Sequence, residues 1–364
     1  MKILHVVGAR PNFMKIAPIM SALRRIAPQI EQVLVHTSQH YDVKMSDIFF
    51  EHLGLSQPDY HLGVGSGSHT EQTARVMLAF EPVLKETNPD LVLVVGDVNS
   101  TIACTLVAVK LGIPVGHVEA GLRSYDRSMP EEINRVLTDQ ISDLLYIPSP
   151  DAIANLKREG INAEKIINVG NVMIDTLVQL LPQAEKHWGK LQAEHALEDY
   201  VLVTLHRPAN VDDETRLINI MGALIELSKI KPVVFPVHPR TQNNIAAFGI
   251  GDFPENLKLI APVGYLDFLA LQQHATLVVT DSGGVQEETT YLGIPCLTVR
   301  PNTERPITIE KGTNRLVTDI SILLDEAKNA LDRPKTSDQI IELWDGRASE
   351  RIVEHIIEWY RNRS

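Results

Sequence analysis

Residues 276–299, TLVVTDSGGVQEETTYLGIPCLTV, decide the fold. The apolar run at 277–279 ends in a polar turn that contains two glycines, and a helical period follows the turn. Gly293-Ile294-Pro295 then ends the helix and precedes a second apolar run, a pattern that is typical of doubly wound sheets. The stretch therefore predicts a strand, a helix and a second strand parallel to the first.

The same alternation runs through both halves of the chain. Its apolar runs are KILHVV, QVLVHT, DLVLVVG, IPVGHVE and DLLYIPS in the first half, and YVLVTLH, PVVFPVH, LKLIAP, TLVVTD and IPCLTV in the second. Strands that alternate with helices indicate βαβ units and parallel sheets. Because 364 residues exceed one ordinary core, we expect an α/β protein with two doubly wound, Rossmann-like domains facing across a cleft.

The least regular stretch, between Gly170 and Asp199, marks the linker between these domains. We expect the first domain at 1–170 and the second at 171–347. Segment 348–364 is apolar on one helical face and is expected to pack back on the first domain. Ligands of such sheets bind at the carboxyl ends of the strands, so we expect the site in the cleft.

Composition excludes several classes of protein. A formal net charge of -12 disfavours a nucleic-acid-binding surface, although an anionic small molecule needs only a few local cations. The two cysteines lie far apart in apolar sequence and form no metal-binding cluster. No apolar run approaches the roughly 20 residues of a membrane span, and the N-terminus lacks the features of a signal peptide. We expect a cytoplasmic enzyme with no nucleic-acid or membrane partner.

Two turns in the first half carry charges that a plain turn does not need. In GARPNFMK, residues 8–15, Arg10 and Lys15 place two cations near the start of a helix, which suits a phosphate. In GDVNST, residues 96–101, Asp97 is not needed to cap the following helix. A purely structural carboxylate at the helix N-terminus is the alternative for Asp97.

Three further acids follow the next predicted strand. Glu119 ends the run IPVGHV, where an unpaired carboxylate is costly unless something binds it. Glu131 and Glu132 open a helix, and ordinary acid bias at a helix N-terminus is the alternative for both. Since Asp97 and Glu119 end consecutive strands, we expect both to face one pocket.

The turn at 281–288 combines features for two parts of one ligand. Ser282, Gly283 and Gly284 place a hydroxyl and closely approachable amides at a helix start, which favours a phosphate. Glu288 shares the helix face of Gly284 and can accept two hydrogen bonds from a diol such as a ribose. Glu287 points about 100° away, so we interpret it as a helix-start acid without a ligand role.

Two other features bear on the class of reaction. His206 follows the run YVLVTL and can donate a proton, or a hydrogen bond to phosphate, near neutral pH, with a structural histidine as the alternative. The stretch GVGSGS at 63–68 lacks the third glycine of a dinucleotide fingerprint, and no strand leads into it. An NAD site is therefore not indicated.

The motifs GARPNFMK, GDVNST, HVEAGLRS, PEEINR, HRPAN, TDSGGVQEE and TERPI together resemble those of the non-hydrolysing UDP-N-acetylglucosamine 2-epimerase family. The resemblance covers most of the chain, and the ordered set is specific. It implies the GT-B fold of many glycosyltransferases, a UDP-binding second domain, and reversible inversion at C2 of the sugar without metal or nicotinamide. The implied route is anti elimination of UDP to 2-acetamidoglucal followed by re-addition. A homodimer is implied as well.

The resemblance also implies roles for individual residues. Asp97, Glu119 and Glu131 match the carboxylates implicated in removal and delivery of the C2 proton, with their division of labour open. His206 matches the histidine that assists departure of UDP. The positions that hold UDP match Arg10, Lys15, Ser282, Gly283, Gly284, Glu288, Arg305 and, beside the uracil, Phe268.

Several alternatives stay open. A C2 epimerase for a UDP-2,3-diacetamido uronic acid sugar shares many of these motifs. A GT-B glycosyltransferase would use a similar UDP site but would need an acceptor pocket, and three acids favour elimination over a single displacement. Many bacterial members bind a second, activating UDP-N-acetylglucosamine near a segment that Gln39 and His40 match and Asp42 does not clearly match.

Overall fold

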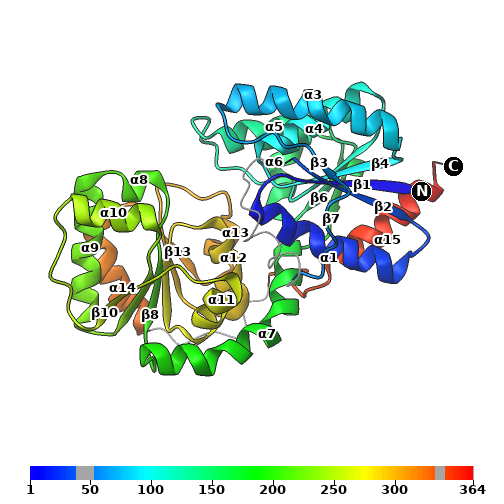
Figure 1. Cartoon of the computed structure of the whole chain (residues 1–364). Coiled ribbons are helices and arrows are strands. Elements are labelled where there is room, and N and C mark those ends of the chain that lie inside the picture. The colour runs from blue at the N-terminus through cyan, green and yellow to red at the C-terminus, as the bar shows by residue number, and fades with distance from the viewer. Residues whose placement is uncertain (38–52, 333–340, 364) are drawn as a thin grey trace. The chain divides into compact units, whose positions relative to one another are not determined.

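The computed structural model describes residues 1–37, 53–332 and 341–363, so that Gln39, His40 and Asp42 lie outside the described residues. The chain divides into two compact units, each built on its own sheet (Figure 1). Unit 1 comprises Met1–Thr176 and Glu342–Ser364, and unit 2 comprises Leu177–Ile341.

Unit 1 is built on a parallel sheet whose described strands have the order β3-β2-β1-β4-β5-β6-β7. The central strand β4, LVLVV, is apolar along its whole length because helices cover both faces of the sheet. The strands are β1 (Lys2–Val7), β2 (Glu31–His36), β3 (Tyr60–His61), β4 (Leu91–Val95), β5 (Val115–Val118), β6 (Leu144–Ile147) and β7 (Ile166–Asn168).

The helices of unit 1 form two layers, with α3, α4 and α5 on one face of the sheet and α1 and α15 on the other (Figure 1). The C-terminal helix α15 packs on α1, and its N-terminus is fixed by Asp175, which accepts hydrogen bonds from the amides of Ala348 and Ser349 at 3.0 and 2.7 Å. The helices are α1 (Arg10–Ile26), α3 (His69–Thr87), α4 (Asn99–Lys110), α5 (Pro130–Ile141), α6 (Asp151–Arg158), η1 (Ala163–Lys165), α7 (Val172–His195), which continues into unit 2, and α15 (Ala348–Arg361).

Unit 2 repeats the architecture with a parallel sheet in the order β10-β9-β8-β11-β12-β13. Its strands are β8 (Val201–Thr204), β9 (Val233–Pro236), β10 (Leu257–Ile260), β11 (Leu277–Thr280), β12 (Cys296–Val299) and β13 (Asn314–Val317). Its helices are α8 (Pro208–Val211), α9 (Glu214–Ser228), α10 (Pro239–Ala247), α11 (Tyr265–His274), α12 (Gly283–Leu292), α13 (Ile307–Glu310), η2 (Ile320–Ile322) and α14 (Leu323–Leu331).

Alternate side chains of each strand face opposite helix layers in unit 2. Leu277 and Val279 of β11, with Leu297 and Val299 of β12, share one apolar core with α9 and α14. Helices α11 and α12 cover the other face of the sheet (Figure 1). The expected α/β fold with parallel, doubly wound sheets is confirmed in both units.

Both sheets reverse their strand order next to the first strand of the unit. The reversal lies between β1 and β4 in unit 1, and between β8 and β11 in unit 2. Connections leave such a switch point in opposite directions, so the turns beyond the strand ends frame a ligand-binding crevice. Asp97, His206 and Ser282 lie in the turns after β4, β8 and β11, and Lys15 lies in the first part of α1, which follows β1.

Other expectations concern membranes and cysteines. Within the described ranges, no helix is long and apolar enough to cross a bilayer. Cys104 and Cys296 are both buried and free of any disulfide.

Candidate active site

The turn after β1 is held by the buried side chain of Asn12. Its Oδ1 accepts hydrogen bonds from the amides of Gly8 and Ala9 at 3.0 and 2.9 Å, and its Nδ2 donates to the carbonyl of Val95 at 3.1 Å. Gly8 leaves no room for a side chain, because a Cβ there would stand 2.5 Å from Ser100 Oγ. The GARP turn is therefore tied to the end of β4.

Lys15 forms a buried ion pair with Glu119. Nζ of Lys15 contacts Oε2 of Glu119 directly, and the two side chains are only 8% and 5% exposed. The pair lies against Gly96, where a Cβ would stand 3.0 Å from the lysine nitrogen. Lys15, which is predicted to bind phosphate, is also the cation that pairs with Glu119. The predicted phosphate ligand Arg10 begins α1, and its side chain lies outside the described part.

Glu119 has a strained backbone. Its φ of +73° lies in the left-handed region that favours glycine, and its amide donates to the carbonyl of Tyr146 at 3.0 Å. A non-glycine residue in this region costs on the order of 1–3 kcal/mol and persists only where the surroundings enforce it. Strain of this kind at a buried carboxylate is typical of functional sites.

Asp97 lies in the turn between β4 and α4. Its Oδ2 is 2.5 Å from Nη2 of Arg135 on α5, and its side chain is 32% exposed. Asn134 donates to the Asp97 carbonyl at 2.9 Å and so fixes the backbone of the turn. Asp97 and Glu119 therefore end neighbouring strands, each beside a cation from a different helix.

The two acids that open α5 have different environments. Glu132 is buried, accepts hydrogen bonds from the amides of Ser124 and Tyr125 at 3.0 and 2.8 Å, and lies 3.1 Å from Arg135. Glu131 is half-buried, and among the residues that the structure describes its carboxylate has no hydrogen bond or ion pair. Glu132 therefore holds a loop, while Glu131 remains available to a ligand.

In unit 2, His206 faces a buried carboxylate. Its Nδ1 is 3.0 Å from Oδ1 of Asp281, and its ring is on the exposed side of the pair, with 54% of the side chain accessible. Asp281 also accepts hydrogen bonds from the Arg207 amide at 2.9 Å and from Asn210 Nδ2 at 3.0 Å. Burial opposes ionisation of Asp281, but these bonds and the charge of His206 outweigh it and lower its pKa. The aspartate thereby orients the imidazole so that Nε2 faces outward.

The two glycines at the start of α12 serve different purposes. At Gly283 a Cβ would stand 2.5 Å from Nη1 of Arg305, so the arginine occupies that space. At Gly284 a Cβ would meet no atom within 4 Å, and φ is not positive. The described protein thus gives no internal reason for glycine at 284. The Ser282 side chain does not cap the helix, so it and the first amides of α12 are available to an anion.

Arg305 is fixed beside this helix start by two acids. Its Nε lies 2.8 Å from Oε1 of Glu287, and its Nη1 contacts Glu304, which also pairs with Arg300 at 2.9 Å. Burial, and then the positive charge of Arg300, lower the pKa of Arg207 nearby. The interpretation of Glu287 as a helix-start acid is wrong: it is 1% exposed, lies in the second turn of α12 and binds Arg305.

Glu288 is buried with one phenol partner. Tyr265 of α11 donates its hydroxyl to Oε1 of Glu288 at 2.8 Å. Burial, and to a lesser extent the charge of Glu287, raise the pKa of Glu288 to about 7, although the Tyr265 hydrogen bond opposes the shift. The predicted uracil neighbour Phe268 lies one turn further along α11 and is half-buried.

Sequence reasoning missed Asn12 and Arg135 in unit 1 and Asp281 and Tyr265 in unit 2. Asp281 stands between strand β11 and Ser282, and an aspartate ahead of a phosphate-type turn was the available signal. Tyr265 gave no signal, because its contact with Glu288 spans 23 residues.

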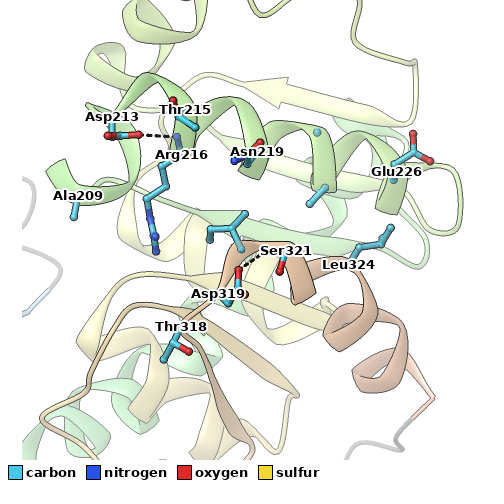
Figure 2. A pocket seen from close by; sticks show the side chains of 13 residues that line it. Ala209, Asp213, Thr215, Arg216, Asn219, Glu226, Thr318, Asp319, Ser321 and Leu324 are labelled. Atoms are coloured by element: carbon cyan, nitrogen blue, oxygen red, sulfur yellow. Dashed lines mark hydrogen bonds between the residues drawn. The ribbon is translucent and has the colours of Figure 1, made fainter.

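Unit 2 has two surface hollows, which are lined by residues other than the predicted ones. One, about 770 Å³, lies between α9 and segment 318–324, with Asp213, Arg216 and Asp319 on its walls (Figure 2). The other, about 490 Å³, is lined by α7 and the loop after β10 and includes Val263. Neither contains a residue predicted for catalysis or for UDP.

Comparison with known proteins gives consistent matches over the length of the chain. The family model described as UDP-N-acetylglucosamine 2-epimerase matches residues 22–357. The UDP-N-acetylglucosamine 2-epimerase of Methanocaldococcus jannaschii is 45% identical over 97% of this chain and 98% of its own. The UDP-2,3-diacetamido-2,3-dideoxy-D-glucuronate 2-epimerase of Pseudomonas aeruginosa is 43% identical over 98% of this chain and 99% of its own.

A solved structure agrees with these matches. The crystal structure of the Methanocaldococcus jannaschii enzyme in complex with UDP-GlcNAc and UDP matches with a TM-score of 0.88 at 44% identity, covering 98% of this chain and 100% of that one. The GT-B-like fold class expected from the motifs is therefore confirmed. The chain belongs to the UDP-N-acetylglucosamine 2-epimerase family.

Proposed function

We propose that this protein interconverts UDP-N-acetylglucosamine and UDP-N-acetylmannosamine by inversion at C2. One observation carries the proposal: two carboxylates, Asp97 and Glu119, end neighbouring strands beside the switch point of unit 1, and one of them is buried on a strained backbone. Membership of the family, with a relative of that activity at 45% identity, supports the same substrate.

The chemistry follows from the substrate. The C2 proton is not next to a carbonyl, so a base cannot remove it simply as an acidic proton. In an anti elimination the electron pair of the C2–H bond forms the C1–C2 double bond, and UDP leaves with the electron pair of the C1–O bond. Re-addition of UDP to 2-acetamidoglucal, with a proton delivered to the opposite face of C2, gives the epimer. The sequence is redox-neutral.

Unit 1 supplies the acid and base groups in this proposal. Glu119 and Asp97 exchange protons with the two faces of C2, and Glu131, whose carboxylate is not engaged within the described structure, is the third participant. Lys15 and Arg135 hold their carboxylate partners in place through ion pairs. Which acid removes the proton and which returns it depends on the direction of the reaction.

Unit 2 binds the nucleotide in this proposal. The diphosphate rests on the amides of Gly283 and Gly284 and the hydroxyl of Ser282, with Arg305 beside them. His206, oriented by Asp281, donates its Nε2 proton to the departing phosphate oxygen. The remaining nucleotide contacts are assigned to the ribose reader Glu288, the uracil neighbour Phe268 and the phosphate ligand Arg10.

A second candidate substrate is a UDP-2,3-diacetamido uronic acid sugar. The relative with that activity is 43% identical over nearly the full chain, so overall similarity barely separates the two substrates. The elimination chemistry is common to both, since each sugar carries an acetamido group at C2.

The two substrates are separated by direct assay. We expect purified protein with UDP-N-acetylglucosamine alone to produce UDP-N-acetylmannosamine, seen as a second anomeric proton signal by NMR. The diacetamido uronate sugar, tested in parallel at the same concentration, is expected to turn over at least tenfold more slowly. Turnover of the uronate alone would replace the proposed substrate with the second candidate.

We infer that the protein acts as a homodimer in the cytoplasm. Leu78 on α3 and Ile133 and Leu137 on α5 are large apolar side chains that remain 74%, 42% and 49% exposed in unit 1, and a dimer contact would cover such groups. Light scattering should give twice the 40.5 kDa chain mass, and a mass of one chain would contradict the dimer.

A further inference from the structure

His117 is a fully buried histidine on β5 that the proposed chemistry does not use. Its Nδ1 lies 2.6 Å from Oδ1 of Asp139 on α5, and its Nε2 lies 2.8 Å from the carbonyl oxygen of Gly96. The imidazole therefore has one short contact at each ring nitrogen.

The two contacts fix the protonation state of the ring. A carbonyl oxygen can only accept, so Nε2 of His117 must carry a proton. Oδ2 of Asp139 accepts a hydrogen bond from the amide of Gly121 at 3.0 Å and lies 2.7 Å from Nη2 of Arg123, and these two donors favour an ionised carboxylate. An ionised carboxylate also only accepts, so Nδ1 carries a proton too. His117 is then an imidazolium.

The surrounding charges allow a buried imidazolium. Asp139 also lies 2.7 Å from Nη2 of Arg123, and Arg123 lies 2.6 Å from Glu159. Two cations and two carboxylates thus balance, as a buried cluster requires. Two further groups of charges lie beside the cluster. The Lys15–Glu119 ion pair lies on Gly96, and Arg135, one turn before Asp139 on α5, pairs with Asp97 and Glu132.

The cluster joins the two turns that carry the proposed acids. Through His117 it holds the carbonyl of Gly96, the residue before Asp97. Through Oδ2 of Asp139 it holds the amide of Gly121 at 3.0 Å, two residues after Glu119. Both glycines have positive φ, at +69° and +81°, so each turn depends on an unusual backbone conformation.

We propose that His117 is a positioning residue, which donates from both ring nitrogens and with Asp139 sets the distance between the turns of Asp97 and Glu119. The inference rests on the proposed function, in which these two carboxylates exchange protons with C2. His117 does not touch the substrate; it acts through Gly96. A neutral ring could donate at only one nitrogen, and the other would present a lone pair to an acceptor.

The protonation state is tested on the wild-type protein by long-range ¹H–¹⁵N NMR with labelled histidine. We expect both ring nitrogens of His117 to carry a proton at the pH of the activity assay. His5 is an internal reference of the opposite kind, since it is also fully buried in this sheet and burial lowers its pKa to about 3. A His117 ring that carries a proton on only one nitrogen would overturn the inference.

Kinetics test the positioning role. His117→Gln should lower kcat by about 100-fold with KM changed less than threefold, because a small misplacement of reacting groups is costly, whereas His5→Gln should leave both unchanged. Asp139→Asn should regain kcat as pH is lowered and His117 takes up its second proton. An unchanged kcat in His117→Gln, or an Asp139→Asn profile parallel to wild type, contradicts the role. The NMR result does not depend on turnover, so an inactive wild type would instead refute the proposed function.

Discussion

Glu119 combines three properties that rarely occur together: it is buried, ionically paired and held at a φ of +73°. Each costs folding free energy on its own, whether through desolvation of the two charges or through backbone strain. Sequence position alone identified the residue, because a carboxylate ended an apolar strand. The positive φ and the Lys15 partner, 104 residues away, could not be predicted from local pattern.

We expect Glu119→Gln to abolish exchange at C2 while retaining affinity for UDP. The amide keeps the shape of the side chain but cannot act as a base, and it leaves Lys15 buried without its counter-charge. Deuterium exchange and calorimetric titration with UDP measure the two effects separately. Glu164→Gln, an exposed acid on η1, serves as control. Unchanged turnover in Glu119→Gln would contradict a catalytic role for Glu119 and leave it only a structural role.

Glu288 predicts a pH dependence of substrate binding. Its pKa of about 7 leaves the carboxyl mostly neutral at pH 6 and mostly ionised at pH 8. Only the ionised form accepts hydrogen bonds from both ribose hydroxyls, so KM for UDP-N-acetylglucosamine should fall roughly tenfold over this range. Glu288→Gln should show a higher KM that does not vary with this ionisation. A wild-type KM that is flat from pH 6 to pH 8 would argue against the assigned role.

The raised pKa of Glu288 also makes the free energy of unfolding depend on pH: a rise in pH that favours substrate binding lowers this free energy. Because the folded pKa lies above the ordinary 4.5, the unfolded chain loses this proton first as pH rises. The contribution of Glu288 to the free energy of unfolding therefore decreases from about pH 4.5 and levels off above pH 7. Ionisation of Glu288 therefore favours ligand binding and disfavours folding.

At the scale of elements, the start of α12 shows how similar glycines differ. The sequence placed both Gly283 and Gly284 at a helix N-terminus, as the structure does. The sequence could not show that Gly283 makes room for Arg305 while Gly284 faces open space. Arg305 belongs to a separate turn, after β12, and local pattern does not indicate this contact. The buried Glu287–Arg305 pair was missed for the same reason.

This difference gives a matched pair of substitutions. Gly284→Ala should leave the melting temperature unchanged or slightly higher, because the added Cβ meets no atom within 4 Å and alanine favours the helix. The same substitution should raise KM for the UDP-sugar about tenfold, because the methyl group crowds the diphosphate. Gly283→Ala should lower the melting temperature, because its Cβ would clash with Arg305. Steady-state kinetics and thermal unfolding of both variants distinguish a glycine that contacts the ligand from a glycine that makes room for Arg305. A Gly284→Ala enzyme with normal KM would exclude phosphate contact there.

At the scale of the whole chain, apolar runs predicted ten strands, and each corresponds to a strand in the structure. The three additional described strands, β3, β7 and β13, all lie at a sheet edge. Edge strands are covered on fewer sides, and these are short or polar, with sequences YH, IIN and NRLV. The hydrophobic pattern therefore predicts the buried central strands of each sheet but, of the four described edge strands, predicts only β10.

The C-terminal helix illustrates long-range packing that its amphipathic pattern indicated only in part. Residues Ile352, Val353 and Ile356 of α15 are fully buried, and the helix packs on α1, more than 300 residues earlier.

Ile356→Ala should therefore lower the free energy of unfolding by about 2–5 kcal/mol, through lost burial and a residual cavity. Urea titration followed by tryptophan fluorescence measures this. Ile218→Ala, 42% exposed on α9, should change it by less than about 0.5 kcal/mol. Equal effects would contradict docking of α15.

The central claim is that the carboxylates of unit 1 exchange the C2 proton of a UDP-sugar while UDP departs from C1. Incubation of the protein with UDP-N-acetylglucosamine in D₂O tests it most directly. The account predicts UDP-N-acetylmannosamine carrying deuterium at C2, deuterium in recovered substrate, and slow release of UDP and 2-acetamidoglucal. A C2 that keeps its proton, with no mannosamine epimer formed, would contradict the account.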